Sequence, residues 1–124
     1  MRWALIAVPT AGSLVLTACG EDGKAQGETV EMVEMRYEPA DLTIRSGTTV
    51  TWTNESDFVH TVTTNPALLQ DGSLVSSPAG EEFDSGNIAP GASWSHTFAT
   101  PGEYRYACIP HELAGMVARL VVDS

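Results

Sequence analysis

The chain has 124 residues, the length of a single domain, and 43% of them are hydrophobic, which is enough to bury a core. Sixteen acidic and six basic residues give a formal net charge of −10. This balance argues against nucleic-acid binding, because contacts with phosphate backbones need a basic surface. An acidic surface favours solubility and basic partners, but the same acids can equally form a solvated face.

The first 18 residues are typical of an export signal peptide. Arg2 provides a positively charged start, and the mostly apolar run that follows, from Trp3 to Leu16, is short for a transmembrane helix. Residues 16–19, Leu-Thr-Ala-Cys, resemble the lipobox of bacterial lipoproteins, where cleavage leaves the cysteine as a lipid-carrying N-terminus. We therefore predict a signal peptide over residues 1–18 and a lipid anchor at Cys19. The alternative is an ordinary signal peptide with an incidental cysteine near its cleavage point.

Residues 20–28, GEDGKAQGE, contain three glycines, four charged residues and no large apolar residue. Such a composition is typical of a solvated linker. We therefore expect residues 19–28 to form a flexible tether between the membrane and a folded domain over residues 29–124. A lipid-linked Cys19 has no free thiol, so it is not expected to pair with the second cysteine, Cys108.

From residue 29 onward, short runs of alternating apolar and polar residues are separated by turn residues, and no segment keeps a helical period over three turns. Residues 65–88, rich in proline and glycine, predict a long loop with at most one brief strand around residues 82–84. The pattern favours an all-β domain, an antiparallel Greek-key β-sandwich of about seven to eight strands. Strands are predicted over residues 29–36, 41–45, 48–53, 59–64, 93–98, 103–108 and 116–123.

The stretch from Cys108 to Met116 carries the chemistry. A thiol, the imidazole of His111 and a thioether lie within nine residues between two predicted strands, and this soft ligand set suits copper. A blue-copper site needs a second histidine in a trigonal arrangement with a weak axial methionine. His60, at the start of a β-branched run, is the candidate, whereas His96 lies within a predicted strand and is interpreted as structural. Each of these residues, taken alone, can also be read as ordinary packing.

With these residues, the domain resembles the cupredoxin family, particularly its plastocyanin, pseudoazurin and halocyanin branch. The Cys-x2-His-x4-Met spacing matches that branch, and the resemblance covers nearly all of residues 30–123. It implies that His60, Cys108 and His111 are equatorial ligands of one copper ion and that Met116 is the axial ligand. Further shared features are Thr51-Trp52-Thr53-Asn54, His60-Thr61-Val62, Phe83-Asp84-Ser85-Gly86, Pro90-Gly91 and the run from Phe98 to Cys108.

The resemblance also implies a supporting shell around the ligands. The backbone N–H of Thr61 is expected to reach the sulfur of Cys108, and the ring of Pro110 limits motion in the ligand loop. The edge of His111 is expected to reach the surface within an apolar patch that includes Pro110 and Leu113. Electrons would enter and leave there.

The function implied is that of a one-electron carrier cycling between Cu(I) and Cu(II), and not of an enzyme. Its expected partners are redox proteins such as cytochromes or membrane oxidoreductases, and no nucleic acid. We expect a monomer, exported and lipid-anchored at the outer face of the cytoplasmic membrane or in the periplasm. The alternatives are a copper chaperone or copper-handling protein of the export compartment, a copper enzyme, and a metal-free sandwich. The enzyme is disfavoured because four protein ligands leave no open position for a substrate.

Overall fold

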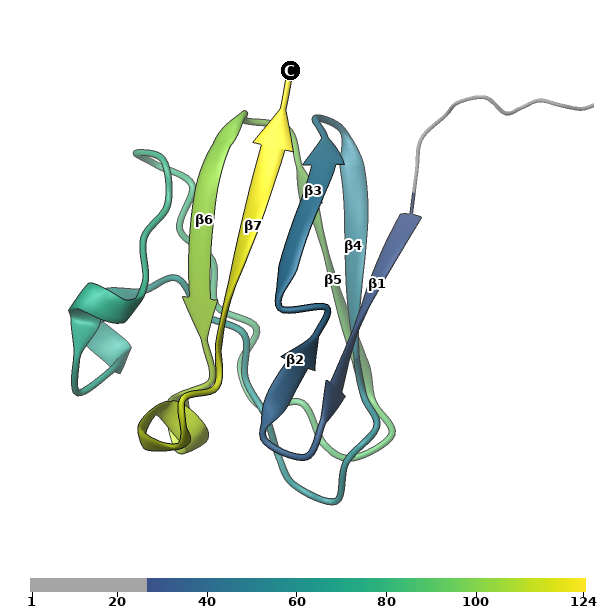
Figure 1. The fold of residues 1–124 in the computed structure, drawn as a ribbon, viewed down its shortest axis with the longest axis vertical. Helices are drawn as coiled ribbons and strands as arrows, with labels where there is room; N and C mark the ends of the chain where they lie inside the picture. Colours follow the sequence, from purple (N-terminus) through teal and green to yellow (C-terminus); the bar gives the residue numbers. More distant parts are fainter. Residues whose placement is uncertain (1–26) are drawn as a thin grey trace, which may run out of the picture.

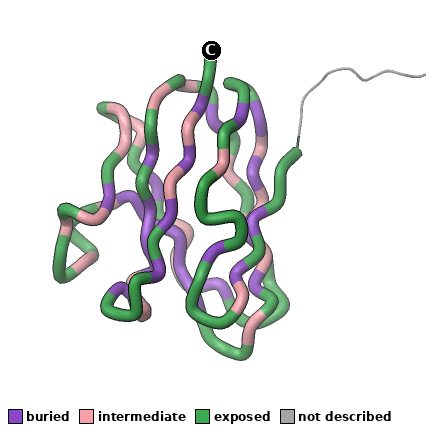
Figure 2. Tube along the Cα trace, viewed as in Figure 1, coloured by how far each residue is buried: buried purple, intermediate pink, exposed green. Residues whose placement is uncertain are grey.

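The computed structural model describes residues 27–124, in which two β-sheets face each other across an apolar core (Figures 1 and 2). The expected signal peptide, the Cys19 anchor and residues 19–26 of the expected tether lie outside this range. In the part described, no helix has the length and apolar character needed to cross a membrane. The strands are β1 (Gly27–Val33), β2 (Arg36–Glu38), β3 (Asp41–Arg45), β4 (Thr48–Asn54), β5 (Ser93–Phe98), β6 (Gly102–Ala107) and β7 (Val117–Asp123).

The two sheets have the strand orders β2-β1-β4-β5 and β3-β7-β6, and their arrangement confirms the predicted sandwich. The expected antiparallel pairing is found for β1 with β2, β4 with β5 and β6 with β7, whereas β1 runs parallel to β4 and β3 runs parallel to β7. Both sheets are therefore mixed. An alternating pattern records which face of a strand is buried, and it carries no information on the direction of the neighbouring strand.

Two strands have the predicted limits, since β3 and β5 cover the residues predicted for them. The run predicted over residues 29–36 instead divides into β1 and β2, which form a hairpin around Glu34 (φ 52°). β1 begins two residues earlier than the expected domain, and Gly27 and Glu28 pair with Thr49 and Val50 of β4.

The prediction of a strand over residues 59–64 is wrong. This segment makes only single bridges, in which His60 pairs with Ile88 while Thr63 pairs with Asp84 and Ala107. β-branched residues fit a pleated surface, but here the segment passes between neighbours without a continuous ladder. Two short 3-10 helices, η2 (Pro66–Leu68) and η3 (Gly72–Leu74), interrupt the long loop predicted over residues 65–88.

The core is centred on Trp52 in the middle of β4, which is fully buried. β4 alternates strictly, so Val50 and Trp52 face the core, while the hydroxyls of Thr49 and Thr51 meet hydroxyls of β5 on the other face. His96 of β5 packs with its ring centroid 4.7 Å from that of Phe83. The aromatic rings of Phe83, Trp94, Phe98 and Tyr106 surround Trp52 at centroid distances of 5.4–6.2 Å.

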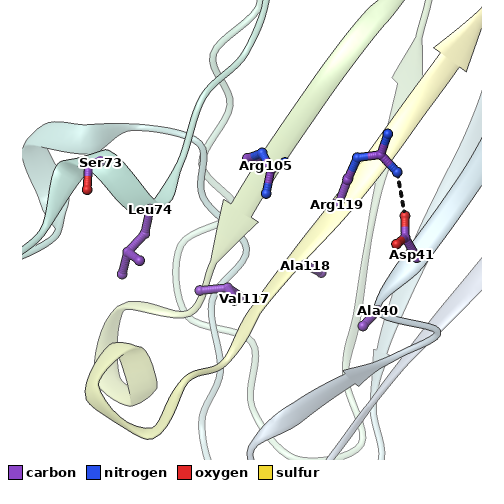
Figure 3. A pocket seen from close by; sticks show the side chains of 8 residues that line it. All are labelled: Ala40, Asp41, Ser73, Leu74, Arg105, Val117, Ala118 and Arg119. Carbon is purple, nitrogen blue, oxygen red and sulfur yellow. Dashed lines mark hydrogen bonds and ion pairs between the residues drawn. The ribbon is translucent and has the colours of Figure 1, made fainter.

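On the outer face of the β3-β7-β6 sheet, a hollow lies between the sheet and η3 (Figure 3). Its two guanidinium groups are already paired, because Arg119 contacts Asp41 and Glu103 at 2.8 Å and Arg105 contacts Glu103 at 2.9 Å. Hydrogen bonds from Arg119 lower the pKa of Glu103 and so favour its charged form. The exposed ion pairs at the hollow therefore join three strands, and neither of its arginine side chains is left without an acidic partner.

Candidate metal centre

The ligand loop, residues 108–116, connects β6 to β7 and is held together by its own hydrogen bonds. It contains the short helix η4 (Ile109–Ala114), which has Pro110 at its start and Gly115 in a left-handed conformation (φ 83°) at its end. The N–H of Cys108 donates to the carbonyl of Met116 at 3.1 Å, and the N–H of Met116 donates to the carbonyl of His111 at 3.3 Å. These bonds place three of the four predicted ligands on one compact turn at the end of the sandwich that carries η4 (Figure 1).

His60 reaches the same end of the molecule from a different part of the chain. Its backbone exchanges two hydrogen bonds with Ile88, at 3.1 and 2.8 Å, which fix the segment between the sheets. The preceding turn is organised by Asn54, whose side-chain N–H groups donate to the carbonyls of Phe58 and Ile88 at 2.7 and 2.9 Å. Ser56 Oγ then lies 2.8 Å from His60 Nε2, which leaves Nδ1 as the nitrogen facing the ligand loop.

The predicted equatorial residues come together. The ligand atoms of His60, Cys108 and His111 all lie within 4.8 Å of one another. Cys108 Sγ is 3.5 Å from His60 Nδ1 and 3.4 Å from His111 Nδ1, and the two imidazole centroids are 4.9 Å apart. Met116 is fully buried at the end of the same loop. His96 is not part of this cluster, in agreement with its interpretation as structural.

Thr61 connects three segments around the cysteine. Its N–H donates to Cys108 Sγ with the nitrogen 3.4 Å from the sulfur, which is the contact that the resemblance to the cupredoxins implies. Its hydroxyl accepts the N–H of Ile109 at 2.8 Å, and its carbonyl accepts the hydroxyl of Tyr37 at 2.6 Å. Groups that surround a metal ligand in this way fix its orientation and tune the metal it binds.

Burial controls the protonation of these groups. It raises the pKa of the Cys108 thiol, against hydrogen bonds from Thr61 and His111 that lower it. Burial, and then the neighbouring His111 ring, lower the pKa of His60. Both shifts favour neutral groups, because a charge is poorly solvated in this position. A metal that binds the thiolate must therefore displace the thiol proton.

Sequence reasoning assigned no role to Asn54, Ser56 and Tyr37, whose hydrogen bonds hold residues of the site, or to Glu112, which accepts the N–H groups of Gln70 and Asp71. Asn54 stands in a motif shared with the cupredoxins, and this was the one available signal. Tyr37 and Glu112 act on segments 24 and more than 40 residues away in the chain, which a single sequence does not reveal. Ser56 acts on His60 within one turn, and its role depends on the conformation of that turn.

His111 is the ligand nearest to solvent. It is half-buried, and its ring centroid lies 5.7 Å from that of Phe58, a side chain with 41% of its surface exposed. Leu113, two residues further along the ligand loop, is 82% exposed. The His111 ring thus lies close both to the buried sulfur of Cys108 and to the exposed ring of Phe58.

The donor set fits copper. One cysteine sulfur and two imidazole nitrogens converge in a buried pocket, with a methionine on the same loop, and this combination suits a blue-copper site. In contrast, Mg²⁺ and Ca²⁺ prefer oxygen ligands, and none of the clustered groups is a carboxylate.

Comparisons with known proteins agree with this geometry. Residues 25–123 match the family model described as copper binding proteins, plastocyanin/azurin family. The chain is 39% identical over 111 residues to chloroplastic plastocyanin of Tetradesmus obliquus, covering 90% of this chain and 72% of the relative. It is 31% identical to plastocyanin of Synechococcus sp. over 123 residues, covering 98% of this chain and 82% of the relative.

Among solved structures, an amicyanin variant in its Cu(I) state superposes with a TM-score of 0.64 at 25% identity, covering 78% of this chain and 82% of the other. The chain therefore belongs to the plastocyanin/azurin family of copper-binding proteins and, like plastocyanin and amicyanin, is an electron carrier rather than an enzyme.

Proposed function

We propose that His60, Cys108 and His111 hold one copper ion, with Met116 as a fourth, axial ligand, and that the protein transfers single electrons through this ion. The observation that supports the proposal is the convergence of two imidazoles and a thiol to within 4.8 Å in the interior of a sandwich. The bound ion supplies the Cu(II)/Cu(I) couple, and the protein supplies a fixed set of ligands.

The chain's own residues keep the ligands in place. Ser56 holds the far nitrogen of the His60 ring, and Thr61 donates to the cysteine sulfur while accepting from the ligand loop. Cys108 and Met116 are completely shielded from solvent. A buried, hydrogen-bonded ligand set changes little when one electron is added or removed, and fast electron transfer requires such a small rearrangement.

The surface around His111 is the proposed point of electron exchange. The exposed ring of Phe58 lies beside it, and small apolar contacts suit the brief, weak encounters of redox proteins. We infer that the partners are cytochromes or membrane oxidoreductases. We further infer that the protein acts as a monomer.

A copper titration followed by redox cycling tests this function. We expect the purified protein to bind one equivalent of Cu(II) with an intense blue colour, to lose that colour with one equivalent of reductant, and to regain it on reoxidation. A Cu(I)-specific chelator should remove little copper from the reduced protein during this cycle. Rapid loss of the metal to the chelator, or absence of the blue colour, would instead favour copper delivery.

The proposed location is the outer face of the cytoplasmic membrane or the periplasm, with Cys19 as the lipid-bearing residue. The lipobox-like sequence at residues 16–19 supports this proposal. We expect the protein produced in a bacterial host to partition into the membrane fraction and Cys19→Ala to partition into the soluble fraction or to remain uncleaved. If the two proteins are cleaved at the same place and fractionate identically, Cys19 is not the anchor.

A further inference from the structure

Glu112 is the acidic side chain that is buried among the described residues, with 6% of its surface exposed. It follows His111 directly in the ligand loop, and its carbonyl accepts the N–H of Gly115 at 3.0 Å. A buried carboxylate is costly unless its charge is stabilised, so its partners indicate why it is there.

The partners come from the long loop between His60 and β5. The N–H of Gln70 donates to Glu112 Oε1 at 2.9 Å, and the N–H of Asp71 donates to Oε2 at 2.6 Å. Among the ion pairs of the described residues, none involves Glu112. Two charge-assisted hydrogen bonds from the main chain therefore stabilise the carboxylate.

These two bonds are important for the long loop. Its helices η2 and η3 bury no side chain, and their hydrogen bonds are local, with Asn65 capping η2 and Asp71 capping η3. Within the described residues, the bonds to Glu112 are the hydrogen bonds that join residues 66–74 to a distant part of the chain. Two residues after η3, Ser76 exchanges two backbone hydrogen bonds with Arg105 of β6, and Glu112 provides the hydrogen bonds that join residues 66–74 to the ligand loop.

We propose that Glu112 is a positioning residue, which fastens residues 66–74 to the ligand loop, fixes the placement of His111 and lowers the reduction potential of the bound copper. The inference rests on the proposed copper site and assigns a role to the long loop beside it. A fixed negative charge next to a copper ligand stabilises Cu(II) more than Cu(I), because the oxidised ion carries the larger positive charge.

The first test uses the metal-free protein and amide hydrogen exchange. Glu112→Gln keeps the shape of the side chain but replaces one acceptor oxygen with an NH2 group, which faces an N–H donor. We expect exchange at Gln70 and Asp71 to become faster by about tenfold or more, because one charge-assisted bond is lost. Glu55→Gln is the matched control, since Glu55 is an exposed acid on the turn before His60. The Glu55→Gln variant should leave the exchange rates of the Gln70 and Asp71 amides unchanged.

The second test measures the reduction potential of the copper-loaded proteins. We expect an upward shift in Glu112→Gln that exceeds the shift in Glu55→Gln, and a partial return towards the wild-type value in Glu112→Asp, which keeps the charge. Equal shifts in the glutamine variants, or wild-type exchange rates at Gln70 and Asp71, would overturn the proposal. A wild-type protein without a blue-copper site would overturn the proposed function instead, while the exchange test would still report on the contact.

Discussion

Cys108→Ser is expected to abolish the intense blue absorption of the copper-loaded protein while leaving the β-sandwich folded. The colour of a blue-copper site depends on the bond between copper and the cysteine sulfur, and a serine oxygen is a harder, weaker ligand. The sulfur of Cys108 lies within 3.5 Å of a nitrogen of each imidazole, and Cys108 is the only thiol among residues 27–124, so no other side chain there can supply a thiolate. We expect Cu(I) affinity to fall by at least about 100-fold, since even changes around a metal ligand cost 10–100-fold.

Visible spectroscopy and a competitive Cu(I) titration measure this effect. The matched control is His96→Gln, which changes a histidine in β5 outside the cluster and should keep both the colour and the affinity. Circular dichroism of the metal-free variants checks that the sandwich remains. A serine variant that stays blue would show that the sulfur of Cys108 is not the ligand responsible.

Trp52→Ala is expected to lower the free energy of unfolding of the metal-free protein by about 3–5 kcal/mol, the range for removing a large aromatic side chain from a core. Trp52 is fully buried and packs against aromatic rings from both sheets, including Phe98 of β5 and Tyr106 of β6. Its removal leaves a cavity between the sheets that the neighbouring rings, held by their own strands, fill only in part.

Urea unfolding followed by circular dichroism measures the loss. Trp94→Ala is the natural comparison, because Trp94 is half-buried on the neighbouring strand and packs against Trp52 at 5.5 Å. We expect its loss of stability to be clearly smaller. Equal losses in the two variants would show that the core is not centred on Trp52.

Much of the fold follows from the sequence because strands with one buried face leave a period-two pattern. β4 is the clearest case, since its alternation records the core face residue by residue. The segment from Val59 to Thr64 shows the limit of this reasoning. Its β-branched residues predict a strand, but a ladder needs a partner that runs alongside, and here the neighbours offer single bridges. The parallel pairing of β1 with β4 was likewise invisible, because the pattern is the same for either direction.

The residues of the site likewise fall into those that could be predicted from the sequence and those that could not. Cys108, His111 and Met116 could be found because they share one short loop, and their chemistry points to copper. His60 lies 48 residues before Cys108, and its assignment depended on the resemblance to a family. Glu112 could not be assigned, because its role depends on a loop more than 40 residues away in the chain.

The position of the first described strand has a consequence for orientation. β1 begins at Gly27 at the end of the sandwich opposite η4, so any attachment through earlier residues holds the domain by the end remote from His111 (Figure 1). A protein anchored at Cys19 would therefore present its electron-exchange surface outward, away from the bilayer. It could then meet water-soluble partners directly, whereas contact with a membrane-embedded partner would require the domain to tip over on its tether or the partner to project well above the lipid.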